Sequence, residues 1–407
     1  MADTIVVTGL GAVSALGLTA EENWQAARDG AGGIEPRAFE PGPHGPQTFT
    51  IPAALVKGDA LGALEAALGR RIGGSLDPFA TLALKASHEA LSQAGLIGAP
   101  LGGRAAVVMG NGIGGLQTLE KAYERFFGLK SPKVHPLTIP RVMVSAPVSA
   151  IAMEFGVTGP VFATSSACAS SGHAIAQGAA LIAGGLADIA VVGGSEAMAS
   201  PAGMRSWDGL QAMSDVTCRP FSAGRDGMII GEGGAALVLE RESHARARGA
   251  KALATWSGAG LTSDAFHWTQ PSLEGTMAAM IQACAPAGLT DADEVLISAH
   301  GTGTPLNDKN EAAAIRGVFG PKAMDHPVIA TKSAHGHVIG GSAALQAVIA
   351  LRALGAGLAP PVLNYLGPDP ECDLDLVLGE ARAIKARALI VNAFAFGGLN
   401  VTLAFTR

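Results

Sequence analysis

The stretch VFATSSACASSGHAIAQGAALIAGG, residues 161–185, predicts a short strand, a turn of small residues and then a helix. Apolar residues recur at helical spacing between Ile175 and Ile182. Cys168 lies where the strand gives way to the helix, so it faces the positive end of the helix dipole. Unpaired N–H groups at such a position lower the pKa of a cysteine and favour a thiolate nucleophile. A buried structural cysteine in a turn of small residues is the commoner alternative.

Composition narrows the class of protein. The chain has 407 residues, enough for one large domain or two ordinary ones. Hydrophobic residues make up 48% and charged residues only 15%, so much apolar surface must be buried. The net charge is -6 without a long basic run, which argues against nucleic acid as the main partner. The four cysteines lie far apart with no CxxC pair, which suits a reducing cytoplasm better than a disulfide framework or a zinc site.

Nothing in the sequence predicts a membrane segment or a secretion signal. The N-terminus, MADTIVVTGLG, has no basic region followed by an apolar region. The most membrane-like stretch, residues 338–358, is interrupted by Arg352 and several glycines. We therefore predict a helix buried within a soluble, cytoplasmic protein, with no membrane insertion.

The hydrophobic pattern predicts two similar α/β halves that pack as one body. Residues 34–60 are rich in Pro and Gly and predict a loop excursion, while residues 78–94 predict an amphipathic helix. Gly9 and Gly11 predict a turn after the first strand, and their spacing lacks the third glycine of a dinucleotide-binding site. Apolar runs predict strands within residues 5–9, 104–110, 187–194, 233–240, 252–260, 294–301, 327–332 and, as a pair, 388–406.

Polar side chains gather at the ends of strands in the second half, where α/β sheets place active sites. His300 ends one strand, and Lys332 and His337 follow another in ATKSAHGHVIGG. Two histidines and a lysine in Gly-rich turns suit a nucleophilic cysteine. A buried Lys332 needs an acidic partner, and Asp308 and Glu311 are the nearest candidates. The turn at residues 394–398, FAFGG, has the composition to present an N–H group to an oxyanion and to gate a pocket.

Together these motifs resemble the β-ketoacyl-ACP synthases of types I and II, the elongating condensing enzymes of fatty-acid and polyketide synthesis. The resemblance runs from IVVTGLG to NVTLAF and includes SSACASSGHAI, RPFSAGRDGMIIGEGG, SDAFHWTQP, HGTGTPLND, KSAHGH and NAFAFGGLN. It implies an α/β thiolase-like fold, with two pseudo-repeated halves in a layered α-β-α-β-α body. Residues 1–250 would carry the nucleophilic cysteine and residues 251–407 the catalytic histidines.

The resemblance implies a Cys-His-His triad of Cys168, His300 and His337. Cys168 would accept an acyl chain from a carrier-protein thioester. His300 and His337 would promote decarboxylation of malonyl-ACP and stabilise the enolate. The carbanion would then attack the acyl-Cys thioester in a Claisen condensation, which extends the chain by two carbons in fatty-acid biosynthesis.

Further roles follow from the same resemblance. The N–H groups of Cys168 and Phe396 would form the oxyanion hole, and Phe396, with Phe394 nearby, would gate the acyl pocket. Lys332 and Glu311 would form an ion pair beside Asp308. Neither a metal nor a resident cofactor is needed, because loss of CO2 drives the step and phosphopantetheine arrives on the acyl carrier protein. Contacts to the phosphopantetheine arm and the acyl chain would come from Thr302, Thr304, Thr269 and Ile113.

The resemblance also implies an acyl carrier protein as partner and a homodimer that pairs through the strand near residues 161–168. The carrier protein is acidic, so a local basic rim is expected. Candidates for this rim are Arg70, Arg71, Lys121, Arg125, Lys130 and Arg205.

Departures from the common pattern predict a specialised branch of the family. Met228 stands for a usual Phe, Asn307 for a commoner Gly and Gln346 for a usual Glu, and residues 72–76 are also altered. One alternative is therefore a ketosynthase of a dedicated polyketide, polyene or unusual-lipid pathway that acts with a partner subunit. A non-catalytic chain-length factor would lack Cys168. A thiolase would need a second cysteine in the NAFAFGG turn, and initiating synthases resemble a Cys-His-Asn arrangement that His337 disfavours.

Overall fold

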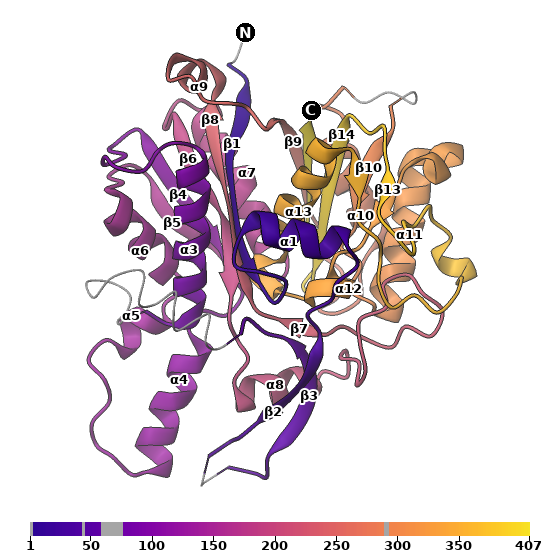
Figure 1. Cartoon of the computed structure of the whole chain (residues 1–407). Helices are drawn as coiled ribbons and strands as arrows, with labels where there is room; N and C mark the ends of the chain where they lie inside the picture. The colour runs from indigo at the N-terminus through magenta and orange to yellow at the C-terminus, as the bar shows by residue number, and fades with distance from the viewer. Residues whose placement is uncertain (1–2, 43–44, 58–75, 289–292) are drawn as a thin grey trace.

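The computed structural model describes residues 3–42, 45–57, 76–288 and 293–407. A ten-stranded sheet runs through these residues in the order β11-β10-β14-β15-β9-β1-β8-β6-β4-β5. Figure 1 shows the first half of the chain in indigo to magenta on one side and the second half in orange to yellow on the other. The strands are β1 (Ile5–Ser14), β4 (Ala105–Gly110), β5 (Val161–Thr164), β6 (Ile189–Glu196), β8 (Gly233–Arg241), β9 (Ala254–Ser263), β10 (Val295–Ser298), β11 (Val328–Ile329), β14 (Ala388–Ala395) and β15 (Leu399–Thr406).

The two halves repeat one pattern of strand pairing. In the first half, β8 pairs antiparallel with β1 and β6, and β4 and β5 continue parallel to β6. In the second half, β15 pairs antiparallel with β9 and β14, and β10 and β11 continue parallel to β14. Three residue pairs between β1 and β9, from Ile5–Trp256 to Val7–Ala254, join the halves. The predicted repetition is therefore confirmed, and every apolar run predicted as a strand contributes to one.

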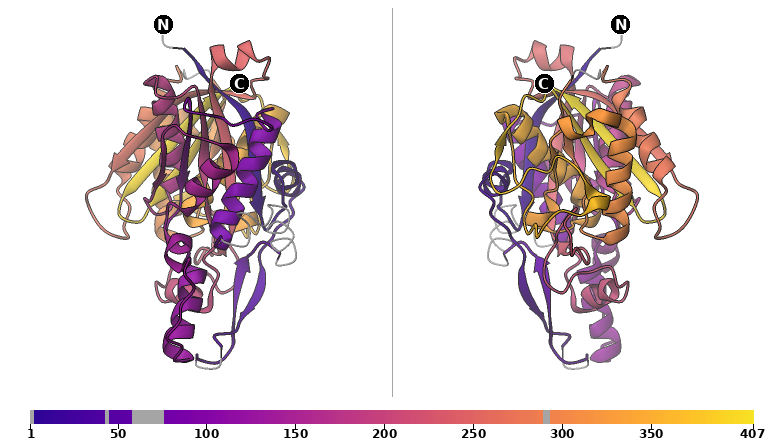
Figure 2. Two further views of the ribbon diagram at one scale, coloured as in Figure 1. Left: turned by 90° about the vertical axis from the view of Figure 1, so that its left-hand side faces the viewer. Right: turned by 90° about the vertical axis from the view of Figure 1, so that its right-hand side faces the viewer.

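Helices cover both outer faces and fill the space between the halves (Figure 2). The outer helices α3 and α6 pack on the first half, and α10 and α11 on the second. Between them, α7 and α13 contact strands of both halves. This gives the layered α-β-α-β-α order. Their bounds are α3 (Pro78–Gln93), α6 (Ala146–Phe155), α7 (Ser170–Ala183), α10 (Leu273–Cys284), α11 (Pro305–Phe319) and α13 (Ser342–Ala356).

Shorter elements connect these layers and build the lower end of the molecule in Figure 1, where β2, β3, α4 and α8 lie. They are α1 (Ala20–Arg28), β2 (Glu35–Phe39), β3 (Phe49–Ala54), α4 (Leu116–Tyr123), η2 (Glu124–Gly128), α5 (Thr138–Val142), α8 (Pro201–Asp208), β7 (Ile230–Gly231), α9 (Glu242–Ala247), η3 (Gly320–Asp325), α12 (Lys332–His335), η4 (Ile339–Gly341), β12 (Leu358–Ala359), η5 (Pro370–Cys372) and β13 (Arg382–Ala383).

The predicted turn at Gly9 and Gly11 is wrong, because β1 continues through both residues to Ser14. A Cβ atom on Gly9 or Gly11 would lie 2.0 Å from a carbonyl oxygen of α3. The glycines therefore serve close packing of α3 on the strand rather than a change of chain direction.

The predicted loop excursion at residues 34–60 also needs correction. Strands β2 and β3 pair antiparallel within it, and β3 also pairs with β7. Phe39 and Phe49 stack across this pair with ring centroids 5.6 Å apart. Cross-strand aromatic contacts of this kind stabilise a hairpin even where the chain is rich in proline and glycine.

The apolar stretch Ile339–Ala356 has the length and composition to cross a membrane, but 83% of it is buried inside the fold. It is a core helix, as predicted, and its packing is that of a soluble protein. All four cysteines are free thiols.

Candidate active site

Cys168 is held in a tight turn between β5 and α7. The preceding residue, Ala167, has φ +50, a left-handed conformation that is strained for any residue with a Cβ atom. Ser170 closes the turn, because its Oγ accepts the N–H of Ser166 at 2.9 Å and donates to the carbonyl of Ala167 at 2.6 Å. The small side chains leave the sulfur at the edge of the central helical layer, and Cys168 is 5% exposed.

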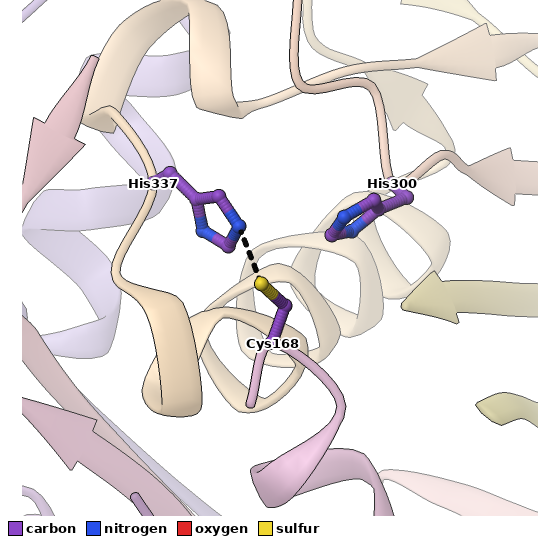
Figure 3. A group of neighbouring side chains, drawn as sticks. All are labelled: Cys168, His300 and His337. Atoms are coloured by element: carbon purple, nitrogen blue, oxygen red, sulfur yellow. Dashed lines mark hydrogen bonds between the residues drawn. The ribbon is translucent and has the colours of Figure 1, made fainter. Parts of the chain in front are cut away.

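The second half of the chain brings two imidazoles to this sulfur (Figure 3). His337 Nε2 lies 3.1 Å from Cys168 Sγ. The rings of His300 and His337 meet edge to face with centroids 5.4 Å apart. The sulfur and one nitrogen of each ring all lie within 4.8 Å of one another. The three residues expected to form a triad are thus in one cluster.

Hydrogen bonds assign the proton of His337 to Nε2. The backbone N–H of Ile339 donates to Nδ1 at 3.1 Å, so Nδ1 carries a lone pair in the neutral ring. The Oγ of Ser342 lies 2.8 Å from the same nitrogen. The remaining proton is therefore on Nε2, which points at Cys168 as a donor.

The same reasoning applies to His300, whose Nδ1 lies 3.3 Å from the ammonium of Lys332. A lysine ammonium has only protons to offer, so Nδ1 accepts and Nε2 carries the proton. Burial, and then the charge of Lys332, lower the pKa of both imidazoles well below the usual value. At neutral pH the site therefore presents two neutral N–H donors in a buried pocket.

The expectation of a thiolate at Cys168 is wrong for the free protein. Burial raises the pKa of this thiol to about 11, despite the charge of Lys332. The backbone N–H groups of Phe396 and of Cys168 itself lower the same pKa. Because one helix terminus does not offset the loss of hydration, the resting group is a thiol. These two N–H groups are the ones that the resemblance assigned to an oxyanion hole.

Lys332 and Glu311 are both buried and do not form the direct contact that was predicted, although the charge of Glu311 raises the pKa of Lys332. Lys332 Nζ instead donates to the carbonyl and Nδ1 of His300 and, at 2.7 Å, to Oε1 of Gln346. Glu311 accepts the backbone N–H groups of His300 at 2.7 Å and Gly301 at 2.8 Å. The lysine fixes the ring of His300 and the glutamate fixes its backbone, so the pair acts on one residue without touching.

Asp308 orders the neighbouring loop. Its carboxylate accepts the N–H groups of Phe221 at 2.8 Å, Thr302 at 3.1 Å and Gly303 at 3.2 Å. The Oγ atoms of Thr302 and Thr304 lie 2.8 Å apart in that loop. Asp308 thus holds the hydroxyls of the loop in place without reaching the sulfur cluster itself.

A cavity of about 380 Å³ leads to the cluster. Ile113 and His300 do not line this cavity. Ile113 lies in the loop between β4 and α4, where its N–H is 3.4 Å from Oε1 of Glu196. Phe396 remains 37% exposed at the wall. The predicted site residues that line the cavity are Cys168, His337, Thr269, Thr302, Thr304, Phe394 and Phe396.

The sequence missed the groups that orient these side chains. Gln346 bridges Lys332 and, at 2.7 Å, the carbonyl of Ala299 before His300. It was noted only as a departure from a pattern. Ser342 follows His337 by five residues, and its Oγ lies 2.8 Å from Nδ1 of that ring, a contact that no sequence pattern marks. Glu196 ends β6 far away in the sequence, and no local pattern marks it.

Two family models match the chain in succession: "Beta-ketoacyl synthase, N-terminal domain" over residues 2–245 and "Beta-ketoacyl synthase, C-terminal domain" over residues 253–366. Nodulation protein E of Rhizobium meliloti (strain 1021) is 39% identical over 404 residues, covering 98% of each chain. The 3-oxoacyl-[acyl-carrier-protein] synthase 2 of Synechocystis sp. is 36% identical over 413 residues, covering 99% of this chain and 98% of that protein.

Solved structures give the same result. The ishigamide ketosynthase/chain length factor is similar with a TM-score of 0.91 and 30% identity, over 100% of this chain and 99% of that one. The AntDE:AntF structure, a type II polyketide synthase acyl-carrier protein in complex with its ketosynthase bound to the hexaketide, has a TM-score of 0.84 and 26% identity over 100% of both chains. With the triad and the layered fold, these matches identify the chain as a member of the β-ketoacyl synthase family, the condensing acyltransferases that include the 3-oxoacyl-[acyl-carrier-protein] synthases.

Proposed function

We propose that the chain extends an acyl chain by two carbons through decarboxylative condensation with malonyl-ACP. One observation carries this proposal: a buried thiol lies 3.1 Å from a neutral imidazole N–H, beside a second such imidazole. A thiol suits covalent capture of an acyl group. Two neutral N–H donors in a dry pocket suit stabilisation of a negative oxygen, which is what loss of CO2 from a malonyl thioester creates.

The first half-reaction transfers the acyl group. The sulfur of Cys168 adds to the thioester carbonyl, and the N–H groups of Cys168 and Phe396 stabilise the oxyanion. The bond to the phosphopantetheine sulfur breaks, and the released thiol carries the proton that Cys168 gives up. The high pKa of the resting thiol suits a transfer in which the proton leaves Cys168 as the acyl group arrives, so that no free thiolate forms at the buried site.

The second half-reaction forms the carbon–carbon bond. The bond between the malonyl carboxylate and the α-carbon breaks, and its electron pair forms an enolate whose oxygen is stabilised by Nε2–H of His300 and His337. The α-carbon attacks the acyl-Cys carbonyl, the bond to Cys168 sulfur breaks, and a proton from solvent restores the thiol. Lys332, Glu311 and Asp308 act as positioning residues. No resident cofactor or metal takes part.

The hydroxyls of Thr302 and Thr304, with Thr269 at the mouth, are proposed to bind the phosphopantetheine arm, since all three line the cavity. Ile113, which does not line this cavity, is proposed to contact the acyl chain. The location proposed is the cytoplasm, in keeping with four free thiols.

A specialised branch is favoured over housekeeping elongation. Two of the departures from the common pattern, Met228 and Asn307, line the cavity, and Gln346 touches Lys332. The altered residues 72–75 lie outside the described residues. Changes in the wall of the cavity alter which substrates fit. A ketosynthase of a dedicated polyketide or unusual-lipid pathway is the second candidate, favoured by the similarity to the ishigamide ketosynthase/chain length factor.

An elongation assay tests the proposal. The chain is incubated with malonyl-ACP and acyl-ACPs of graded length and saturation, and products are read by mass spectrometry. Products two carbons longer are expected, with a preference that differs from a housekeeping synthase. Activity only after a partner subunit is added would favour the second candidate, and no product under either condition would contradict both.

The partner is an acyl carrier protein, as in the AntDE:AntF complex. Lys121 and Arg125 are exposed on α4 and η2, where they line a shallow basic pocket. Changing both to Glu is expected to raise the KM for acyl-ACP at least tenfold with little effect on kcat, because electrostatic complementarity acts on encounter. Lys251→Glu is the control, because Lys251 is exposed and follows α9, which lies at the opposite end of the molecule from α4 (Figure 1). An unchanged KM would contradict the assignment of this surface to the carrier protein. Two other candidates for the basic rim, Arg70 and Arg71, lie outside the described residues.

A second copy of the chain is proposed to pair at β5, the edge strand of the sheet. An edge strand offers unpaired N–H and C=O groups, and Phe162 on β5 is exposed beside them. Sedimentation is expected to give twice the monomer mass, and a monomer would contradict the pairing. Exposed apolar side chains that would join the interface lie just before α6, which packs on β5, and are Leu137, Ile139, Met143 and Val144.

Gln346→Glu is expected to shift the alkaline limit of decarboxylation to higher pH. Burial lowers the pKa of Lys332 to about 8, and its hydrogen-bond acceptors are neutral. A carboxylate at the 2.7 Å position of Gln346 stabilises the ammonium and raises this pKa. The ammonium form of Lys332 orients His300, so wild-type activity is expected to fall as pH rises through 8. The Gln346→Glu protein is expected to keep its activity to higher pH.

The measurement uses Cys168→Gln protein, in which thiol titration no longer contributes, and follows CO2 release from malonyl-ACP between pH 6 and 10. Gln346→Leu is the matched control, because it removes the hydrogen bond without adding charge. Identical alkaline limits in the parent and Gln346→Glu proteins would show that Lys332 does not set this limit.

A further inference from the structure

Glu196, the last residue of β6, is a fully buried carboxylate with no role in the steps above. Its Oε2 accepts the N–H groups of Gly112 at 2.6 Å and Gly340 at 3.1 Å, and its Oε1 faces the N–H of Ile113 at 3.4 Å. Burial raises the pKa of Glu196 to about 7, and only backbone N–H groups act strongly against this. Burying a carboxylate without a neighbouring cation costs free energy, so the presence of Glu196 at this position calls for an explanation.

The carboxylate holds two loops in backbone contact. One is the loop between β4 and α4 that contains Gly112, and the other is the turn η4 that contains Gly340. A Cβ atom on Gly340 would lie 2.3 Å from the backbone nitrogen of Gly112, and one on Gly112 would lie 2.9 Å from Oε2 of Glu196. The two loops therefore touch at glycines, with the carboxylate bonded to both.

The turn η4 determines the orientation of His337. Ile339 donates its N–H to Nδ1 of His337, and this bond assigns the proton to Nε2. Ile339 itself has φ +39, a strained conformation for a β-branched residue. The next residue, Gly340, is the one that Glu196 binds. The strained turn thus has an external support one residue beyond the bond to His337.

The other loop leads towards Cys168. The carbonyl of Gly112 accepts the hydroxyl of Ser165 at 3.2 Å, three residues before the nucleophile. The charge of Glu196 is close enough to raise the pKa of the Cys168 thiol. The carboxylate therefore connects the segment carrying the sulfur with the segment carrying the imidazole.

We propose that Glu196 is a positioning residue for His337, with its carboxylate clamping the β4–α4 loop against the turn that fixes the imidazole. The inference rests on the proposed condensing function. In the clamped state, Nε2–H of His337 is aimed at the reacting oxygen. Without the clamp the strained turn relaxes, and the donor moves off line while the substrate-binding cavity stays intact.

The test compares kcat and KM in the elongation assay for wild type, Glu196→Gln and Glu232→Gln. Gly112 and Gly340 both donate to Oε2, and the neutral amide oxygen of Gln accepts them more weakly than a carboxylate oxygen, while its NH2 group faces the N–H of Ile113. Glu196→Gln is expected to lower kcat by roughly 10–100-fold with KM within about twofold, because an ångström of misplacement costs up to about 10²-fold. Glu232 is the matched control: it is a buried carboxylate whose pKa burial also raises to about 7, but it bonds to Gln117.

Gly340→Ala provides a second variant in case Glu196→Gln does not fold. Its methyl group forces the loops apart with the carboxylate still present, so the same loss of kcat is expected. Thermal melts identify variants that are simply unfolded. Wild-type protein that makes no product would contradict the proposed function rather than this inference.

A double-mutant cycle on malonyl-ACP decarboxylation shows which residue carries the effect. In His337→Ala protein, adding Glu196→Gln is expected to lower the decarboxylation rate only slightly. In His300→Ala protein, adding Glu196→Gln is expected to lower this rate by the same factor as in wild type. An equal cost in both backgrounds would show that Glu196 does not act through His337. A folded Glu196→Gln or Gly340→Ala protein with wild-type kcat, or an equal loss in Glu232→Gln, would likewise overturn the proposal.

Discussion

Cys168→Ala protein is expected to form no acyl-enzyme and no condensation product. The sulfur is the only nucleophile in the cluster with the two imidazoles, and its loss removes covalent capture of the acyl group. The loss of condensation should reach the detection limit, since removing a catalytic nucleophile costs on the order of 10⁶-fold. Intact-protein mass spectrometry after incubation with acyl-ACP provides the measurement.

Two controls make this result specific to Cys168. Cys218→Ala removes a neighbouring buried thiol that donates to the carbonyl of Thr302, and it should leave the acyl-enzyme in place. Cys168→Gln keeps His300 and His337 and should still release CO2 from malonyl-ACP. Label from acyl-ACP found on another residue of the Cys168→Ala protein would refute the assignment.

His300→Ala and His337→Ala are each expected to lower decarboxylation of malonyl-ACP by about two to three powers of ten. Each removes one neutral N–H donor aimed at the enolate oxygen, and such a donor contributes about 3–4 kcal/mol to the barrier. The pKa of both imidazoles lies well below the usual value because of burial. At neutral pH each variant therefore loses a neutral N–H donor rather than a charged one.

His335→Ala is the matched control for the histidine variants. This residue is a third buried imidazole, two positions before His337, and its Nε2 lies 2.9 Å from Oγ1 of Thr331. Decarboxylation by a folded His335→Ala protein should remain within a few-fold of wild type. A comparable loss in all three variants would mean that the effect comes from packing rather than from aimed donors.

The sequence predicted the elements and the reacting groups because these follow from local patterns. Apolar runs located the strands, and small residues around Cys168 located the turn before α7. The same reasoning failed at Gly9 and Gly11, where the reason for glycine is the approach of α3 rather than a turn. It also failed for the hairpin of β2 and β3, since a contact between Phe39 and Phe49 is not a local feature.

The electrostatics of the site were harder to predict for the same reason. A helix terminus near Cys168 is visible in the sequence, but the burial that outweighs it depends on the whole fold. Lys332 was expected beside a carboxylate, yet the nearest acceptors are a carbonyl, an imidazole and Gln346. Glu196 comes from a strand of the first half and supports a turn of the second, so only the folded chain reveals it.

The position of β14 and β15 in the sheet has a consequence for the protein during its synthesis. These strands follow β9 and β10 in the chain, and they insert between them in the sheet. They bring the N–H of Phe396 to Cys168, and Asn392 donates to Glu311 at 3.0 Å. A nascent chain therefore has its thiol early but gains the N–H of Phe396 only after residues 388–406 have been synthesised and have entered the sheet. Until then, the first half of the chain holds Cys168 without this N–H group.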